Sequence, residues 1–375
     1  MAGIYIHIPF CKRRCLYCDF YSTTLLERRA DYIDAVIEEI KSRKEEAGEP
    51  LRTIYLGGGT PSTLEARDVE RILTTIGTEN AEEITMEINP GDVTEAYLQA
   101  LRQAGIDRLS IGIQSFQNEL LQLLGRRHNA AQAMEAVHTA QEVGFDNISI
   151  DLMYALPTQT MDQWKTDIET AIRLGVQHIS SYGLIYEEGT AMTKLVEDGT
   201  LKAQDEETEN AMYDYLCERL KEAGFEHYEV SNFALPGLES KHNSSYWVGT
   251  PYIGIGAAAH SYLPPVRSWN PSDLDTYIKG IMAHNLQRES ETLSLVDTYN
   301  EYIMLGLRTS KGVNEAFTSR YRANFEPMSS QLREINNNLT RFLDKKLLRR
   351  TPDGRIVATQ KGLHILNSII KDLII

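Results

Sequence analysis

Cysteine is scarce in this chain: among 375 residues there are four, and three of them lie within eight positions at Cys11, Cys15 and Cys18. A disulfide framework needs several spaced pairs, so a disulfide-stapled secreted protein is excluded. The compact trio indicates a metal site instead. The distant Cys217 is expected to be a small core residue.

Long apolar runs are also lacking. No stretch approaches the ~18 uninterrupted apolar residues of a membrane helix, and the most apolar tail, 363–375, is interrupted by Asn367, Lys371 and Asp372. The first ten residues show no basic segment followed by an apolar core, so no secretion signal is expected. We therefore predict a cytoplasmic protein that does not span a membrane.

Basic residues are too few to balance the acidic ones: 38 Lys and Arg stand against 53 Asp and Glu, which gives a net charge of -15. Such a charge repels phosphate backbones and anionic membrane surfaces. We predict no nucleic-acid partner. The basic cluster at Lys345, Lys346, Arg349 and Arg350 is interpreted as a solvated helix face.

The first half of the chain alternates short β-branched or aromatic runs with longer amphipathic segments. The runs predict strands at 4–8, 53–56, 84–88, 109–113, 148–152 and 179–184. Turn residues follow several of these strands, as expected where a parallel strand passes into its loop. The pattern predicts an α/β fold with six βα units whose parallel sheet curls into a partial or full barrel.

The rhythm changes after about residue 190. A helix is predicted near 206–223, and the Gly- and aromatic-rich stretch 232–269 is interpreted as an irregular module that lines a site. From about residue 298 the pattern is mostly helical, with a hairpin at 352–357, which suggests a winged-helix-like domain. The predicted domains are 1–230, 231–297 and 298–375.

The three cysteines follow the first predicted strand directly, on the face where barrel enzymes carry their active sites. Four-iron clusters usually take four Cys ligands, so a trio would leave one iron open to an exogenous ligand. Two alternatives stay open: a zinc site with His7 as fourth ligand, and a redox dithiol at Cys15 and Cys18. Zinc motifs normally pair two separated Cys couples, which disfavours the first.

The spacing Cys-x3-Cys-x2-Cys, with Tyr17 before the last cysteine, resembles the signature of the radical S-adenosylmethionine (SAM) superfamily. The resemblance implies a 4Fe-4S cluster on Cys11, Cys15 and Cys18 that reduces SAM to a 5′-deoxyadenosyl radical. Residues 5–10 and 18–20 look like the branch that contains oxygen-independent coproporphyrinogen III dehydrogenases and HemW-type heme chaperones. The resemblance covers nearly the whole chain.

Polar residues stand at successive strand ends. Glycines 57–59 allow close backbone approach to a ligand, and Glu87, Gln114 and Asp151 close the third, fourth and fifth predicted strands. A buried carboxylate is costly unless it is paired or binds a cation, so this convergence indicates one shared ligand site. The resemblance implies that SAM is bound by Tyr5, Tyr17, Gly58, Gly59, Thr60, Glu87, Gln114, Arg126 and Asp151.

A separate motif, His-Asn-x-x-Tyr-Trp, begins at His242. Heme iron is commonly held by His with aromatic rings covering the macrocycle. The residues alone favour a loop His with a hydrogen-bonded Tyr and a packed Trp. The motif nevertheless resembles that of HemW-type heme chaperones, which implies that His242 binds heme. His260 is either a second ligand or structural.

Two departures from the dehydrogenases decide between the branches. Those enzymes carry a further Cys two residues after the trio, where this chain has Phe20, and a longer extension before the trio, where only ten residues precede Cys11. We predict a heme chaperone that binds a 4Fe-4S cluster, SAM and heme and does not oxidise coproporphyrinogen.

The predicted partners are acceptor hemoproteins such as respiratory enzymes, with peripheral contact to membrane-bound acceptors and a homodimer both compatible with the sequence. The alternative is a dehydrogenase of porphyrin metabolism. The sequence leaves open whether the chain also acts as an enzyme that cleaves SAM.

Overall fold

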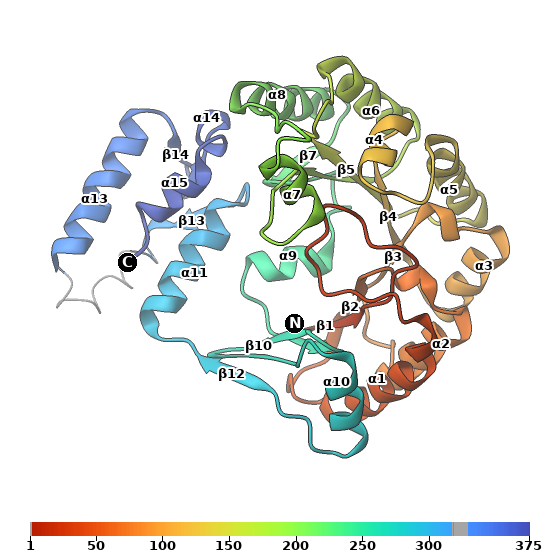
Figure 1. The fold of residues 1–375 in the computed structure, drawn as a ribbon. Coiled ribbons are helices and arrows are strands. Elements are labelled where there is room, and N and C mark those ends of the chain that lie inside the picture. The colour runs from red at the N-terminus through yellow and green to blue at the C-terminus, as the bar shows by residue number, and fades with distance from the viewer. Residues whose placement is uncertain (1, 317, 319–328) are drawn as a thin grey trace.

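The computed structural model describes residues 2–316, 318 and 329–375. Its main element is a sheet in the order β12-β11-β10-β9-β1-β2-β3-β4-β5-β6-β8-β7. The stretch from β9 through β6 is parallel, and both outer parts are antiparallel. The parallel strands curve into a barrel wall, with helices covering the outside (Figure 1).

The six predicted strands are all present. They are β1 (Ala2–Ile8), β2 (Leu51–Gly58), β3 (Glu83–Ile88), β4 (Arg108–Gln114), β5 (Ile148–Tyr154) and β6 (His178–Gly183). The helices of the βα units are α1 (Arg29–Arg43), α2 (Ala66–Ile76), α3 (Glu95–Ala104), α4 (Asn118–Leu123), α5 (Ala130–Val143) and α6 (Met161–Arg173). Strands that are buried on both faces read as near-continuous apolar runs, which is why the sequence located them well.

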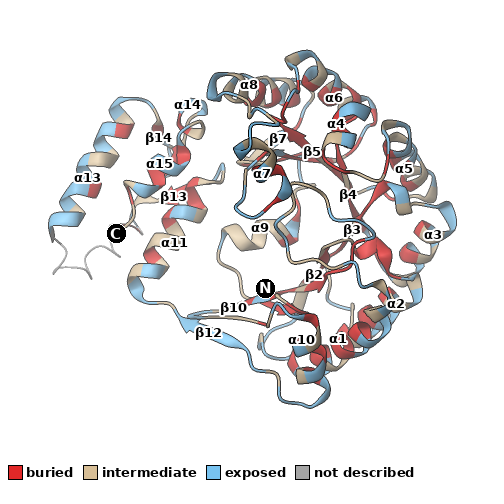
Figure 2. Cartoon of the chain, viewed as in Figure 1, coloured by how far each residue is buried: buried red, intermediate tan, exposed pale blue. Residues whose placement is uncertain are grey.

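Local signals set the helix ends. Asn129 and Thr160 form capping boxes at the starts of α5 and α6, and Gly105 and Gly144 end α3 and α5 in the left-handed conformation. Figure 2 shows the buried residues gathered on the strands and on the inner faces of these helices. The core therefore lies between the sheet and the helical layer.

The stretch 232–269 differs from the expected irregular module, because most of it forms regular elements. They are β8 (Asn232–Ala234), α9 (Lys241–Trp247), β9 (Tyr252–Ile255), β10 (His260–Leu263) and β11 (Val266–Trp269). β9 pairs in parallel with β1, and Ile253 and Ile255 are buried there. An uncovered strand edge would leave the backbone groups of β1 unpaired, and β9 satisfies them. β12 (Glu289–Thr292) extends this side, and β7 (Glu226–Glu229) ends the other.

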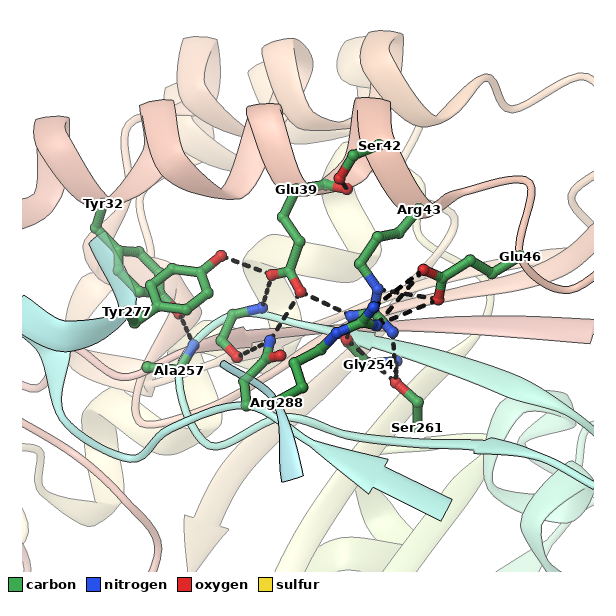
Figure 3. Close-up of polar contacts among 12 residues, drawn as sticks. Tyr32, Glu39, Ser42, Arg43, Glu46, Gly254, Ala257, Ser261, Tyr277 and Arg288 are labelled. Carbon is green, nitrogen blue, oxygen red and sulfur yellow. Dashed lines mark hydrogen bonds and ion pairs between the residues drawn. The ribbon is translucent and has the colours of Figure 1, made fainter. Parts of the chain in front are cut away.

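A buried polar network joins α1 to this stretch and to α10 (Leu274–Met282) (Figure 3). At its centre lies Glu39, which is fully buried. Its carboxylate accepts hydrogen bonds from Arg43 (2.7 Å), Tyr277 (2.7 Å), Asn270 (2.8 Å) and the backbone N–H of Gly256 (2.8 Å). Arg43 also donates to the carbonyl of Gly254 and to the hydroxyl of Ser261. Every acceptor position of this buried carboxylate is thus used.

The C-terminal part has its own apolar cluster, separate from that of the barrel. Its described elements are α11 (Leu295–Leu307), β13 (Val313–Asn314), α13 (Ser329–Asp344), β14 (Leu348–Arg350), β15 (Arg355–Ala358), α14 (Gln360–Leu363) and α15 (Leu366–Lys371). Earlier in the chain, β6 is followed by α7 (Ala191–Glu197) and α8 (Glu206–Glu222). The antiparallel pair of β14 and β15 confirms the expected hairpin. The proposed domain boundaries stay a prediction.

Within the described part of the chain, no helix combines the length and the apolar character that crossing a membrane requires.

Candidate functional site

A cavity of about 520 Å³ opens at the carboxyl ends of the parallel strands. All but two of the predicted site residues line it. They are Cys11, Cys15, Tyr17, Cys18, Gly58, Gly59, Thr60, Glu87, Gln114, Arg126 and Asp151. Tyr5 and His242 are the two that the structure does not bring there. Residues from the cysteine loop, from four successive strand ends and from the connection between α4 and α5 therefore share one space, the arrangement expected of a barrel-type active site.

The cysteine loop is fastened to the rest of the barrel mouth. The backbone N–H of Cys11 donates to the carbonyl of Thr23 (2.8 Å). Lys12 and Arg127 both form ion pairs with Asp92, at 2.7 and 2.8 Å, and the Asp92 side chain is only 2% exposed. Sequence reasoning missed Asp92, although its place in the turn after the third strand offered a signal. These contacts hold the start of the cysteine loop, at Cys11 and Lys12, against the barrel mouth.

The chemistry of the thiols suits an iron-sulfur cluster. Cys11 contacts the hydroxyl of Thr60 (3.3 Å), and Arg126 donates to the sulfur of Cys15 (3.4 Å). Burial raises the pKa of the Cys11 and Cys18 thiols, so without iron they are held as neutral thiols. When thiolates bind iron, a nearby guanidinium offsets part of their negative charge.

The zinc alternative requires His7 to turn one ring nitrogen toward the three cysteines. The ring nitrogens of His7 instead contact the hydroxyl of Tyr5 (3.0 Å) and the carbonyl of Tyr21 (3.0 Å). Cysteines that bind a four-iron cluster each hold a different iron, so they can stand further apart than the ligands of one ion.

Two half-buried carboxylates, Glu87 and Asp151, line the cavity. Glu87 accepts hydrogen bonds from the hydroxyl of Tyr55 (2.9 Å) and from the backbone N–H of Gly58 (3.0 Å). Burial, with the nearby charge of Asp151, raises the pKa of Glu87 to about 7. Burial likewise raises the pKa of Asp151. Such a pair favours a ligand that brings positive charge into the cavity.

The glycines at the end of β2 are required by close packing. A Cβ at Gly58 would lie 2.6 Å from the imidazole of His7, and the φ of +113° at Gly58 is unfavourable for other residues. A Cβ at Gly59 would lie 2.7 Å from the carbonyl of Pro9. The backbone of this turn is therefore bare and open to a ligand in the cavity.

The positions of Gln114 and Arg126 are determined by contacts with neighbouring groups. Gln114 has a φ of 74°, a left-handed conformation that costs energy for a residue with a side chain. The loop that follows it is held by Asp167 of α6, which accepts hydrogen bonds from Ser115 (2.6 Å) and the backbone N–H of Phe116 (2.9 Å). Arg126 donates to the carbonyl of Gly112.

The two predicted residues outside the cavity lie deeper in the barrel. Tyr5 of β1 packs against Tyr55, with ring centroids 6.1 Å apart. His242 of α9 is fully buried, and its Nδ1 and Nε2 contact the hydroxyls of Thr53 (2.8 Å) and Tyr246 (2.8 Å). Burial, with a smaller contribution from Arg108, lowers the pKa of His242 to about 3, so the imidazole is neutral.

The cavity mouth carries exposed apolar side chains that sequence reasoning did not single out as site residues. Phe20 is 65% exposed and Ile185 is 68% exposed, and both line the cavity. No sequence signal distinguished Ile185 from an ordinary core residue.

Comparison with known proteins agrees with this geometry. The family model described as Radical SAM superfamily matches residues 5–171. The heme chaperone HemW of Lactococcus lactis subsp. lactis (strain IL1403) is 39% identical over 377 residues, covering 99% of this chain and 97% of that protein. HemW of Bacillus subtilis (strain 168) is 36% identical, covering 86% of this chain and 87% of that protein.

A solved structure, the coproporphyrinogen III oxidase HemN from Escherichia coli, which is described as a radical SAM enzyme, has a TM-score of 0.83. It is 22% identical, and the match covers 99% of this chain and 89% of that one. This likeness concerns the fold, whereas the extended identity to the two bacterial relatives concerns the family. The chain therefore belongs to the radical SAM superfamily and, within it, to the HemW family.

Proposed function

We propose that this protein is a heme chaperone that binds a 4Fe-4S cluster, SAM and heme, and hands heme to acceptor hemoproteins such as respiratory enzymes. The observation that carries the proposal is the 39% identity to a heme chaperone along 99% of the chain. The proposal also includes peripheral contact with membrane-bound acceptors and the formation of a homodimer.

The residues of the cavity have distinct roles in the proposed cofactor site. Cys11, Cys15 and Cys18 hold the cluster, which when bound supplies an electron to SAM. The bare backbone of Gly58 and Gly59 faces the ligand, with Thr60 and Tyr17 beside it. Glu87 and Asp151 attract the cationic groups of SAM, Gln114 and Arg126 contact its polar groups, and Tyr5 supports the wall behind Glu87.

Heme binding through His242 would require a change in the structure around this residue. To ligate iron, the imidazole must release the hydroxyl of Thr53 or of Tyr246, since both ring nitrogens are engaged. The buried ring must also reach a macrocycle. The role of His242 as a heme ligand stays a prediction, and the experiment of the next subsection tests it directly.

The alternative function is oxidation of coproporphyrinogen III. The HemN likeness supports it at the level of the fold alone, at 22% identity. Phe20 replaces the further Cys of those enzymes and stands 65% exposed at the cavity mouth. We therefore expect the chaperone function and not the oxidation.

One sample can test the two functions. The chain is purified without oxygen, its cluster is reconstituted, and heme is titrated while the Soret band is followed. Transfer is then measured to an apo-hemoprotein, and the same sample is given coproporphyrinogen III, SAM and a reductant. Heme uptake and transfer without protoporphyrinogen formation is the expected result. Rapid protoporphyrinogen formation without heme transfer would establish the alternative.

A further inference from the structure

We propose that His242 is a positioning residue of the SAM site: from the opposite end of the barrel it holds the ring of Tyr55, and Tyr55 holds Glu87. The inference deepens the proposed function and rests on the proposed binding of SAM at Glu87. It gives the His242 motif a role other than ligating heme iron.

His242 is anchored at the amino ends of the strands, away from the cysteine loop. The first turn of α9 contacts Glu83, the first residue of β3. The Glu83 carboxylate accepts hydrogen bonds from the backbone N–H groups of Lys241 (2.9 Å) and His242 (2.9 Å). Thr53, which contacts Nδ1, lies near the start of β2. The imidazole thus enters the barrel at the amino ends of the parallel strands, whereas the cavity opens at their carboxyl ends.

The face of the imidazole lies on Tyr55. The ring centroids are 5.1 Å apart and the planes differ by 25°, which is a stacked arrangement. Thr53 and Tyr55 are two residues apart on β2 and point to the same side, into the barrel. Tyr246, one helical turn after His242 on α9, holds the other nitrogen. The ring that supports Tyr55 is therefore fixed at both nitrogens.

Tyr55 in turn is in direct contact with Glu87. Its hydroxyl donates to the Oε1 atom of Glu87 (2.9 Å). A Cβ at Gly57 would lie 2.7 Å from the Tyr55 ring and 2.9 Å from Oε1 of Glu87, so the three residues fill the available space. The other oxygen of Glu87 accepts the N–H of Gly58 in the glycine turn. A change at His242 therefore reaches Glu87 through packed groups.

The surroundings of His242 also disfavour iron ligation. The side chain has no exposed surface, and both nitrogens already have partners. Freeing one nitrogen would leave a buried hydroxyl without its hydrogen-bond partner, which is unfavourable. A macrocycle would in addition need the space beside the imidazole that Thr53, Tyr55 and Tyr246 occupy. Packing beneath Tyr55 requires neither change.

The test compares two variants of His242 in the full chain with its cluster reconstituted anaerobically. His242→Ala removes the ring that supports Tyr55, whereas His242→Phe keeps an aromatic ring but no atom that can ligate iron. SAM affinity is measured by calorimetry and heme binding by the Soret titration. We expect His242→Ala to weaken SAM binding by at least about threefold, His242→Phe to retain most of it, and both to retain heme.

A double-mutant cycle distinguishes positioning from general destabilisation. Tyr55→Phe removes the hydroxyl that holds Glu87, so adding His242→Ala to this variant should weaken SAM binding by much less than in the wild-type chain. His138→Ala, at an exposed position of α5, is the matched control and should change neither affinity. If His242→Ala does not fold, His242→Phe and Tyr55→Phe keep the core filled and carry the comparison.

Two results would overturn the inference. Equal SAM affinity in the wild-type chain and in His242→Ala would show that the ring does not act on Glu87. Loss of the heme spectrum in both His242 variants, with SAM affinity intact, would identify His242 as the iron ligand. A wild-type chain with its cluster but without measurable SAM affinity would instead refute the proposed SAM site itself, and with it this inference.

Discussion

Replacing Glu39 by Ala should destabilise the protein strongly, although the residue touches no part of the cavity. Glu39 is fully buried and is the common acceptor of Arg43, Tyr277, Asn270 and the N–H of Gly256. Its removal leaves Arg43, a residue that is only 5% exposed, with Glu46 as its remaining carboxylate partner at 3.0 Å.

The magnitude follows from the charge left behind. Breaking a buried ion pair by removing one partner costs about 3–5 kcal/mol, and each buried donor without an acceptor costs about 1–3 kcal/mol. The surviving Arg43–Glu46 pair and entering water reduce the sum. We therefore expect Glu39→Ala to lower the free energy of unfolding by about 3–5 kcal/mol, a large share of the roughly 5–15 kcal/mol typical of proteins.

Urea unfolding followed by far-UV circular dichroism measures this change. The control is Glu38→Ala, one position earlier on α1, whose ion pair with Lys41 (2.6 Å) faces solvent with side-chain exposures of 38% and 56%. An exposed pair contributes about 0–1 kcal/mol. If Glu39→Ala and Glu38→Ala differ by less than about 1 kcal/mol, the reasoning about the buried network is wrong.

Three further outcomes are expected. Cys11→Ala should abolish iron and sulfide binding, whereas Cys217→Ala, outside the cavity, should retain both; chemical analysis and EPR of the reduced samples check this. Because burial raises the pKa of Glu87 from 4.5 to about 7, the stability of the cluster-free chain should fall as the pH rises from about 4.5 to about 7. The carboxylate of the folded chain forms around its raised pKa, so SAM affinity should rise as the pH passes through about 7, and Glu87→Gln should lose both trends. Finally, incubation with coproporphyrinogen III, SAM and a reductant should yield no appreciable protoporphyrinogen IX, and chromatography that detects steady conversion would contradict the Phe20 argument.

The sequence predicted the parallel strands because each is a short apolar run closed by turn residues. It also predicted the gathering of Glu87, Gln114 and Asp151, since the carboxyl ends of parallel strands meet at one edge. Both inferences depend on local pattern and on one general rule of topology. The cysteine spacing also indicated the radical SAM superfamily, which the fold and the similar proteins support.

What the sequence could not predict depends on contacts between distant residues. Nothing near Tyr252 indicates that its strand pairs with β1, because pairing partners are chosen by the whole fold. The motif at His242 gives residue types but not the direction of the imidazole, which the partner hydroxyls of Thr53 and Tyr246 determine. Ile185 resembles a core residue in sequence, yet it stands exposed at the cavity mouth.

The pairing of β1 with β9 also has a consequence for synthesis on the ribosome. β1 begins at Ala2 and its partner begins at Tyr252, so about 250 residues separate their emergence. At roughly 5–20 residues per second, this takes on the order of 12–50 s. During that time one edge of β1 has no partner strand, and the cysteine loop directly after it belongs to an unclosed barrel. Ribosome-bound chains that stop before Tyr252 should therefore aggregate or recruit chaperones more readily than chains that extend past Ile255.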